Sequence, residues 1–95
     1  MTTQAKTPAA VIVEKMIADN DAAIAENAAM IDVYLHELEG RLSSLRSALG
    51  QGNSASGSWV SESARHIEQE LDKREALHRN AISLKRVLKA AQPAE

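Results

Sequence analysis

Apolar residues recur every seven positions along the first half of the chain. The first series consists of Ile17, Ile24, Ile31, Leu38 and Leu45. A second series, four residues after each of the last four of these, consists of Ala28, Leu35, Leu42 and Leu49. This spacing is typical of the a and d positions of a coiled coil, where one helix packs along another. A lone helix cannot bury such a stripe, so the pattern predicts at least two packed helices.

Capping residues predict where this first helix begins and ends. Thr7 suits an N-cap, and Pro8 suits the first helical position, where its missing N–H is not needed. Gly50 suits a C-terminal cap. We therefore expect a helix over about 8–49, preceded by a disordered tail at 1–6.

The polar stretch Asp-Asn-Asp at 19–21 interrupts this helical pattern. Short polar side chains compete for backbone hydrogen bonds, so the stretch allows either a break between two helices or one helix with a polar turn. Ile17 and Ile24 stay in phase across it. This favours a continuous or gently kinked helix.

A second helix follows a connecting loop. Residues 50–57 are rich in Gly, Ser and Asn and have no periodicity, which predicts a loop. Ser58 can cap a helix over about 58–91, and Pro93 lies beyond its end. Residues 7–95 therefore form a single helical domain, expected to be an all-α, coiled-coil-like hairpin.

The two predicted helices carry opposite charge. Residues 8–49 hold three basic and seven acidic side chains, whereas 58–91 hold seven basic and five acidic ones. This complementarity favours an antiparallel hairpin. Folding the chain at 53–54 pairs residues whose numbers sum to about 108 and places Trp59 level with Leu49. The predicted ion pairs are Asp19–Lys89, Asp21–Arg86, Arg41–Glu68 and Arg46–Glu62.

The second helix has a less regular apolar pattern. Its first half has a seam at Val60, Ala64, Ile67 and Leu71, but that seam continues at Arg74, His78 and Lys85. A shifted stripe is formed instead by Leu77, Leu84 and Leu88. Such a stutter either unwinds the coil locally or turns a second face to a second partner. We favour the second face, with contacts to another protein through Leu77, Leu84, Leu88 and Trp59; a Trp59 that caps the seam is the alternative.

Composition limits the core and the chemistry. The chain has no Phe, one Trp and one Tyr, so the core is aliphatic and rich in alanine, and buries little apolar area per residue. We therefore expect dimerisation into a four-helix bundle or a larger symmetric assembly. There is no Cys, which excludes disulfides and thiolate zinc sites. No apolar run approaches the roughly 20 residues of a membrane span, and we expect a cytoplasmic protein.

Charged side chains suggest one ligand site. The second helix carries Arg74, Arg79, Lys85 and Arg86, which could hold a small phosphate-bearing anion at a subunit interface. The alternative is that these cations complement the helix dipole and the acidic first helix. A net charge of −2 opposes a nucleic-acid partner. The three histidines fall at different levels of the hairpin, and no metal site, cofactor or enzymatic motif is expected.

Residues 36–45 read His-Glu-Leu-Glu-Gly-Arg-Leu-Ser-Ser-Leu. This segment resembles the H-box of the dimerisation and phosphotransfer domain of sensor histidine kinases, an antiparallel hairpin that dimerises into a four-helix bundle. The resemblance implies a phosphoacceptor His36 assisted by Glu37. Gly40 and Arg41 stand where that family carries Thr or Asn and then Pro.

These observations predict a non-enzymatic helical interaction module, an adaptor or inhibitor. It would associate with itself and bind another protein through an apolar helix face. The first alternative is an oligomer that binds or sequesters a small anionic ligand. The second is a stand-alone phosphotransfer hairpin that uses His36.

Overall fold

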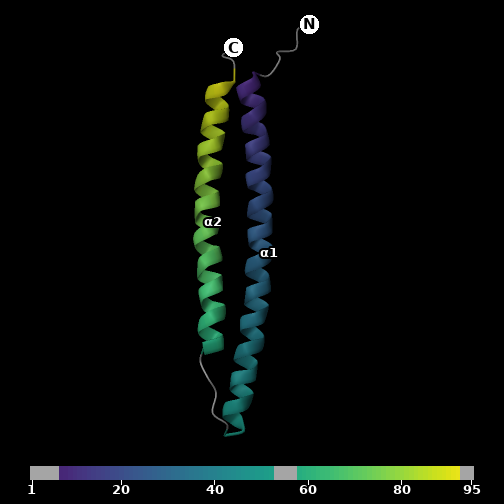
Figure 1. Ribbon diagram of the computed structural model, residues 1–95, viewed down its shortest axis with the longest axis vertical. Helices are drawn as coiled ribbons and strands as arrows, with labels where there is room; N and C mark the ends of the chain where they lie inside the picture. Colours follow the sequence, from purple (N-terminus) through teal and green to yellow (C-terminus); the bar gives the residue numbers. More distant parts are fainter. Residues whose placement is uncertain (1–6, 53–57, 93–95) are drawn as a thin grey trace.

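The computed structural model describes residues 7–52 and 58–92, which form two packed helices (Figure 1). Helix α1 spans Pro8–Gly50 and helix α2 spans Ser58–Ala91. They run antiparallel, so the first residue of α1 and the last of α2 lie at the same end (Figure 1). The molecule measures 77 × 20 × 16 Å, a width that fits two helices of about 10 Å side by side. The predicted all-α hairpin is confirmed.

Thr7 ties the ends of both helices together. Its hydroxyl accepts a hydrogen bond from the Ala10 amide at 3.0 Å, which caps α1, and Pro8 follows it in the first turn. The same hydroxyl donates to the Ala91 carbonyl at 2.9 Å. Carbonyl groups in the last turn of a helix have no partner within that helix, so one side chain satisfies groups of two helices.

Helix α1 runs through residues 19–21 without a break. The Asn20 side chain does not bond to its own backbone but donates to the Leu77 carbonyl of α2 at 3.0 Å. The polar turn is therefore part of the helix interface. At its other end α1 stops at Gly50, and Gly52 has a φ of 76°, a conformation that glycine adopts without strain. The predicted tail at 1–6 and most of the predicted loop, 53–57, lie outside the described residues.

The seam of α1 differs from the predicted one. The first apolar series is half-buried, but Ala28, Leu35, Leu42 and Leu49 are exposed. With Ile17 at position a, the inward d positions lie three residues after each a residue, not four. These d positions are occupied by Val13, Asn20, Asn27, Tyr34, Arg41 and Ala48, all buried or half-buried. The a row is bordered by the d positions on one side and by the e positions on the other. The prediction was wrong because α2 packs against the d positions, whose polar side chains bond to it.

The seam of α2 has no stutter. Buried or half-buried residues recur in an unbroken pattern of three and four, namely Val60, Ser63, Ile67, Glu70, Arg74, Leu77, Ala81, Leu84, Leu88 and Ala91. Ala64 and Leu71, predicted to lie in the seam, are exposed. The heptad was hidden because Ser63, Glu70 and Arg74 hold seam positions that an apolar pattern does not detect.

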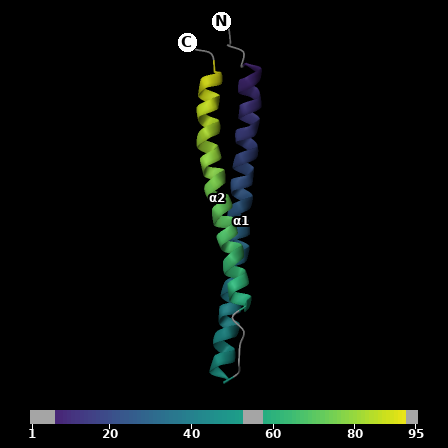
Figure 2. The ribbon, with the colours of Figure 1, turned by 60° about the vertical axis from the view of Figure 1, so that its left-hand side comes forward.

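The register of the hairpin also differs from the prediction. Asn20 bonds to Leu77 and Asn80, and Asn27 bonds to Glu70, so paired residue numbers sum to between 97 and 100. Partners are therefore displaced by more than two helical turns from those predicted, and none of the four predicted ion pairs forms among the described residues. The reason is asymmetry: α2 begins beside Arg41, and the last turns of α1 extend past it (Figures 1 and 2).

Among the described residues, the buried core is small and half polar. Its apolar members are Ala10, Val13 and Leu84, and its polar members are Asn20, Asn27 and Ser63. A core of this size removes little apolar surface from water. The intramolecular interface thus has specific polar pairing but limited hydrophobic stabilisation.

Replacing Asn27 tests the role of this polar seam. Asn27 is 1% exposed, and its Nδ2 donates to the Glu70 carbonyl at 2.8 Å, while its Oδ1 has no hydrogen-bond partner in the described part of the chain. We expect Asn27→Leu to raise the free energy of unfolding by about 1–2 kcal/mol in urea titrations, because it removes a buried unpaired acceptor. It should also loosen the register, seen as extra amide resonances. The exposed Ala29→Leu is the control, and a less stable variant with one set of resonances would contradict this role.

Candidate functional site

The two sides of the hairpin differ in chemistry. One side, the polar flank, carries the side-chain contacts between helices at the level of Asn20, Tyr34 and Arg41 of α1. Asn80 donates to the Asn20 Oδ1 at 2.9 Å, and the Tyr34 ring lies 4.9 Å from the His66 ring. These α1 residues are at d positions, so the polar contacts align along the whole hairpin. They position α2 against this side of α1.

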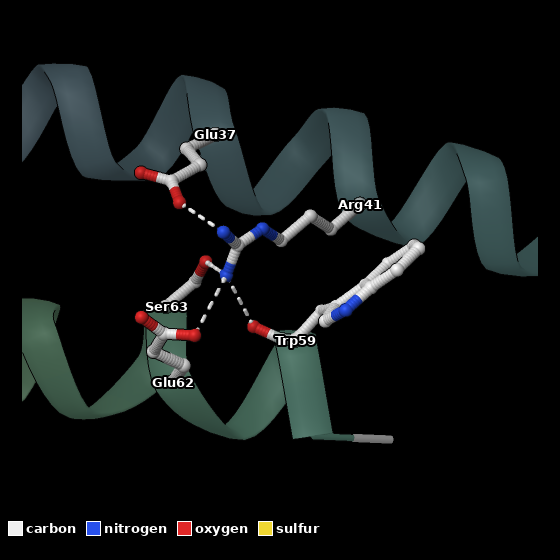
Figure 3. A network of polar contacts seen from close by, with 5 residues as sticks. All are labelled: Glu37, Arg41, Trp59, Glu62 and Ser63. Atoms are coloured by element: carbon white, nitrogen blue, oxygen red, sulfur yellow. Dashed lines mark hydrogen bonds and ion pairs between the residues drawn. The ribbon is translucent and has the colours of Figure 1, made fainter. Parts of the chain in front are cut away.

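Arg41 holds the start of α2 (Figure 3). Its Nη1 donates to the Trp59 carbonyl at 2.7 Å and to the Ser63 Oγ at 2.8 Å, and its Nη2 pairs with Glu37 at 2.6 Å. Glu62 lies further away, at 3.9 Å from Nη1. One guanidinium thus joins two acidic side chains, a buried hydroxyl and a carbonyl in the first turn of α2. Arg41 therefore has a structural role, because its hydrogen bonds and ion pairs are made to groups of the hairpin itself.

His66 packs into the same flank. Its ring is tilted by 42° to that of Tyr34, and its Nδ1 is buried with no partner among the described residues. No group of three His, Asp or Glu side chains within residues 7–52 and 58–92 is placed to hold a metal ion. His66 is therefore positioned as a packing residue of the polar flank.

The opposite side presents an apolar surface, which we call the leucine flank. It consists of Leu35, Leu42 and Leu49 of α1, Leu71 of α2 and the flanking Ala28 and Ala64. The leucines are 41%, 42%, 62% and 51% exposed, respectively. They are at the e positions of the two heptads, which adjoin the half-buried a rows, and e positions of antiparallel helices lie along the same side of the pair. Exposed apolar side chains that gather on one side of a protein make that side a candidate interaction site.

The predicted partner-binding leucines lie elsewhere. Leu77, Leu84 and Leu88 occupy seam positions of α2, and Leu84 is 7% exposed. The face predicted to be free is the intramolecular interface, because α2 has no stutter that would turn these residues away from α1. Trp59 is 59% exposed and lies level with Arg41 rather than Leu49, so it does not cap the seam.

The four predicted anion-binding residues do not converge. Arg74 is half-buried in the seam, whereas Arg79 is exposed and pairs with Glu75 at 3.0 Å. Arg86 lies two turns from Arg79 on the outer side of α2, and Lys85 lies next to the seam on another side. Since an anion needs several donors around one point, this arrangement does not form a single site.

His36 lies on the outer side of α1 with 71% of its side chain exposed. Its Nδ1 donates to the Asp32 carbonyl at 2.8 Å and lies 3.6 Å from the Asp32 carboxylate. The bond to the Asp32 carbonyl, with the charges of Asp32 and Glu39, raises the pKa of His36 above 6.5. Glu37, predicted to assist His36, is paired instead with Arg41. The predicted pair of His36 and Glu37 is therefore not formed in the described part of the chain.

No protein-family model, curated protein or solved structure matches the chain. Neither helix, over its described residues, is apolar enough for long enough to cross a membrane. The candidate site is the leucine flank, defined by its exposure and its heptad positions. The sequence signal that could have located it is a second heptad series, the polar or amphipathic residues Asn20, Asn27, Tyr34 and Arg41, which marks the side that α2 covers.

Arg41→Ala tests whether Arg41 fixes the start of α2. Loss of its bonds leaves the buried Ser63 hydroxyl without this donor. We expect the free energy of unfolding to fall by about 1–3 kcal/mol, and amide hydrogen exchange to accelerate mainly in the first turns of α2. Arg46→Ala, which changes an exposed arginine of the same helix, should have little effect. Uniform acceleration throughout both helices would contradict a local role.

The environment of His36 predicts a titration above its ordinary range. Because the folded-state pKa is raised, the stabilising contribution is fully present below the unfolded-state pKa of about 6.5 and disappears as pH rises through the folded-state value. An NMR titration of the His36 ring should therefore give a midpoint above 6.5. Asp32→Asn should lower the midpoint, whereas an unchanged midpoint would show that the Asp32 charge does not act on His36.

Proposed function

We propose that the protein is a non-enzymatic helical interaction module that binds other helices through the leucine flank. The observation that carries this proposal is the division of the hairpin into two flanks. The polar contacts that orient α2 lie on one flank, and exposed leucines at heptad spacing lie on the other. Leu35, Leu42 and Leu49 repeat every seven residues, which is the spacing that a partner helix recognises.

Energetics support the same conclusion. Fully burying an exposed leucine contributes about 1.5–3 kcal/mol, and the four leucines of the flank, which are 41–62% exposed, would each contribute about half of that. The folded hairpin, in contrast, buries only three apolar side chains, Ala10, Val13 and Leu84, among its described residues. Association through the leucine flank would therefore bury apolar surface that the single hairpin leaves exposed.

A charged substitution within the leucine flank tests this function. We expect the double variant Leu35→Asp, Leu42→Asp to keep its helical circular dichroism, because both residues are exposed and outside the seam. It should lose association with itself or with proteins of its own cell at least tenfold, since a carboxylate is not buried in an apolar contact without a partner.

Val33→Asp is the matched control. Val33 is an exposed aliphatic residue of the same helix, about 200° around the axis from Leu35 and thus on the other side. The two proteins would be compared by sedimentation and by chemical cross-linking in cells. Equal association of wild type, the double variant and Val33→Asp would refute the leucine flank as the binding surface.

A further inference from the structure

The e positions of the two helices match one another level by level. Hydrogen bonds between the helices pair residues whose numbers sum to between 97 and 100. At this register the e residues form four level pairs, two that combine an acidic residue with lysine or histidine and two that combine alanine with leucine. They are Glu14 with Lys85, Asp21 with His78, Ala28 with Leu71, and Leu35 with Ala64. The charged pairs lie toward the chain ends and the apolar pairs toward the loop.

Much of this side of the hairpin is not engaged within the chain. Leu35 and Leu71 are 41% and 51% exposed, and Asp21 and His78 are exposed as well. Arg74, one turn before His78, is half-buried in the seam. Neither its guanidinium nor the Asp21 carboxylate forms a hydrogen bond or ion pair among the described residues. The side thus offers apolar groups near the loop and charged groups near the chain ends.

We propose that the occupant of the leucine flank is a second copy of this chain, with both loops at the same end and a twofold axis parallel to the hairpin. This inference rests on the proposed function and names its partner. Such an axis places each level of one copy opposite the same level of the other, with α1 of one copy against α2 of the other. Leu35 then lies opposite the partner's Ala64, and Ala28 opposite the partner's Leu71.

The charged residues near the chain ends agree with this orientation. Asp21 of one copy lies opposite the partner's His78 and within about one helical turn of the level of the partner's Arg74. The Arg74 guanidinium thereby gains a carboxylate across the contact. Antiparallel copies in full overlap would instead place Leu35 and Leu42 opposite the acidic e positions of the other α1, so burying a leucine would also bury a charge.

This orientation forms a four-helix bundle with an apolar core near the loop. The half-buried a rows lie next to the e rows, so Ile31 of α1 and Ile67 of α2 become buried with them. The last turns of α1 extend past the start of α2 (Figures 1 and 2). In the dimer the two extensions run parallel, and Leu42, Leu45 and Leu49 have the spacing of three and four that packs one helix on another.

Acidic residues near the loop oppose this orientation, but only weakly. Asp32 of one copy comes nearly level with the partner's Glu68, and both occupy b positions at the rim of the contact. Both residues are exposed, where salt screens charges over about 8 Å at physiological ionic strength. Repulsion between two exposed carboxylates is small beside the burial of the leucines.

Mass and label-to-label distance test the second copy and its orientation. Sedimentation equilibrium of the full chain should give twice the chain mass of 10.3 kDa. The chain has no Cys, so Ala22→Cys, Ala29→Cys and Ser43→Cys each introduce one spin-label site. All three residues are exposed and occupy f positions of α1, so they point in the same direction at three levels of the hairpin.

A twofold axis parallel to the hairpin gives nearly the same label-to-label distance at all three sites, because each label faces its own level. In an antiparallel dimer the distance grows with the separation of the label from the crossing axis. The three distances then differ by about 20 Å or more wherever that axis lies, since each residue adds about 1.5 Å along the helix. Unequal distances therefore overturn the orientation.

Asp21→Arg tests the charged pairs near the chain ends. It replaces attraction to the partner's Arg74 and His78 by repulsion at two symmetry-related places, and should weaken dimerisation about fivefold or more. Asp19→Arg is the matched control, because it makes the same charge change at an exposed c position outside the e and b rows. Equal dissociation constants for the two variants would overturn the charge pairing.

The leucine variants separate failure of this proposal from failure of the proposed function. The dimer should become monomeric with Leu35→Asp, Leu42→Asp but not with Val33→Asp. A wild-type monomer at every concentration tested overturns the second copy as occupant. The proposed function survives that result if the double variant still abolishes cross-linking to a different protein, and it fails as well if the double variant behaves as wild type in both assays.

Discussion

The hydrogen bonds that Asn20, Asn27 and Arg41 make to α2 are the constraint on which the rest of the hairpin depends. Apolar contacts between two heptad rows tolerate a shift of one heptad, because one leucine or isoleucine replaces another at similar distance. A buried amide does not tolerate it: without its partner it costs about 1–3 kcal/mol. Carbonyls of α2 are found at every heptad, but the side-chain partners are not: Asn20 meets Asn80, Asn27 meets the Glu70 carboxylate and Arg41 meets the Ser63 hydroxyl at one alignment. Together they define register and orientation.

The same bonds decide which surface stays exposed. Since α2 lies against the polar d residues of α1, the leucines at e positions on the other side of the a row stay 41–62% exposed. The leucine flank is thus a direct result of the polar seam. The hairpin combines a specific but weakly apolar interface within the chain with an apolar surface at heptad spacing outside it, which supports a role in helix-to-helix association.

Side chains that could carry chemistry are held apart or already engaged. Glu37 is paired with Arg41, the His36 imidazole is bonded to Asp32, and Arg79 is paired with Glu75. His66 packs against Tyr34 within the polar flank. A surface of leucines is therefore a better-supported functional feature than any polar cluster of the described residues.

The sequence by itself determined two long helices, the N-cap at Thr7 and the antiparallel pairing, because periodicity, capping and charge are local or summed properties. Gly50, expected as the C-terminal cap, is instead the last residue of α1, and Gln51 is the cap. The sequence did not determine the seam. The residues Leu35, Leu42 and Leu71 fit an inward row as well as an outward one, and Ser63, Glu70 and Arg74 conceal the continuous heptad of α2. Only the tertiary structure decided which side is covered, because the side chains that bond to Asn20, Asn27 and Arg41 lie on the other helix and meet them at one register alone.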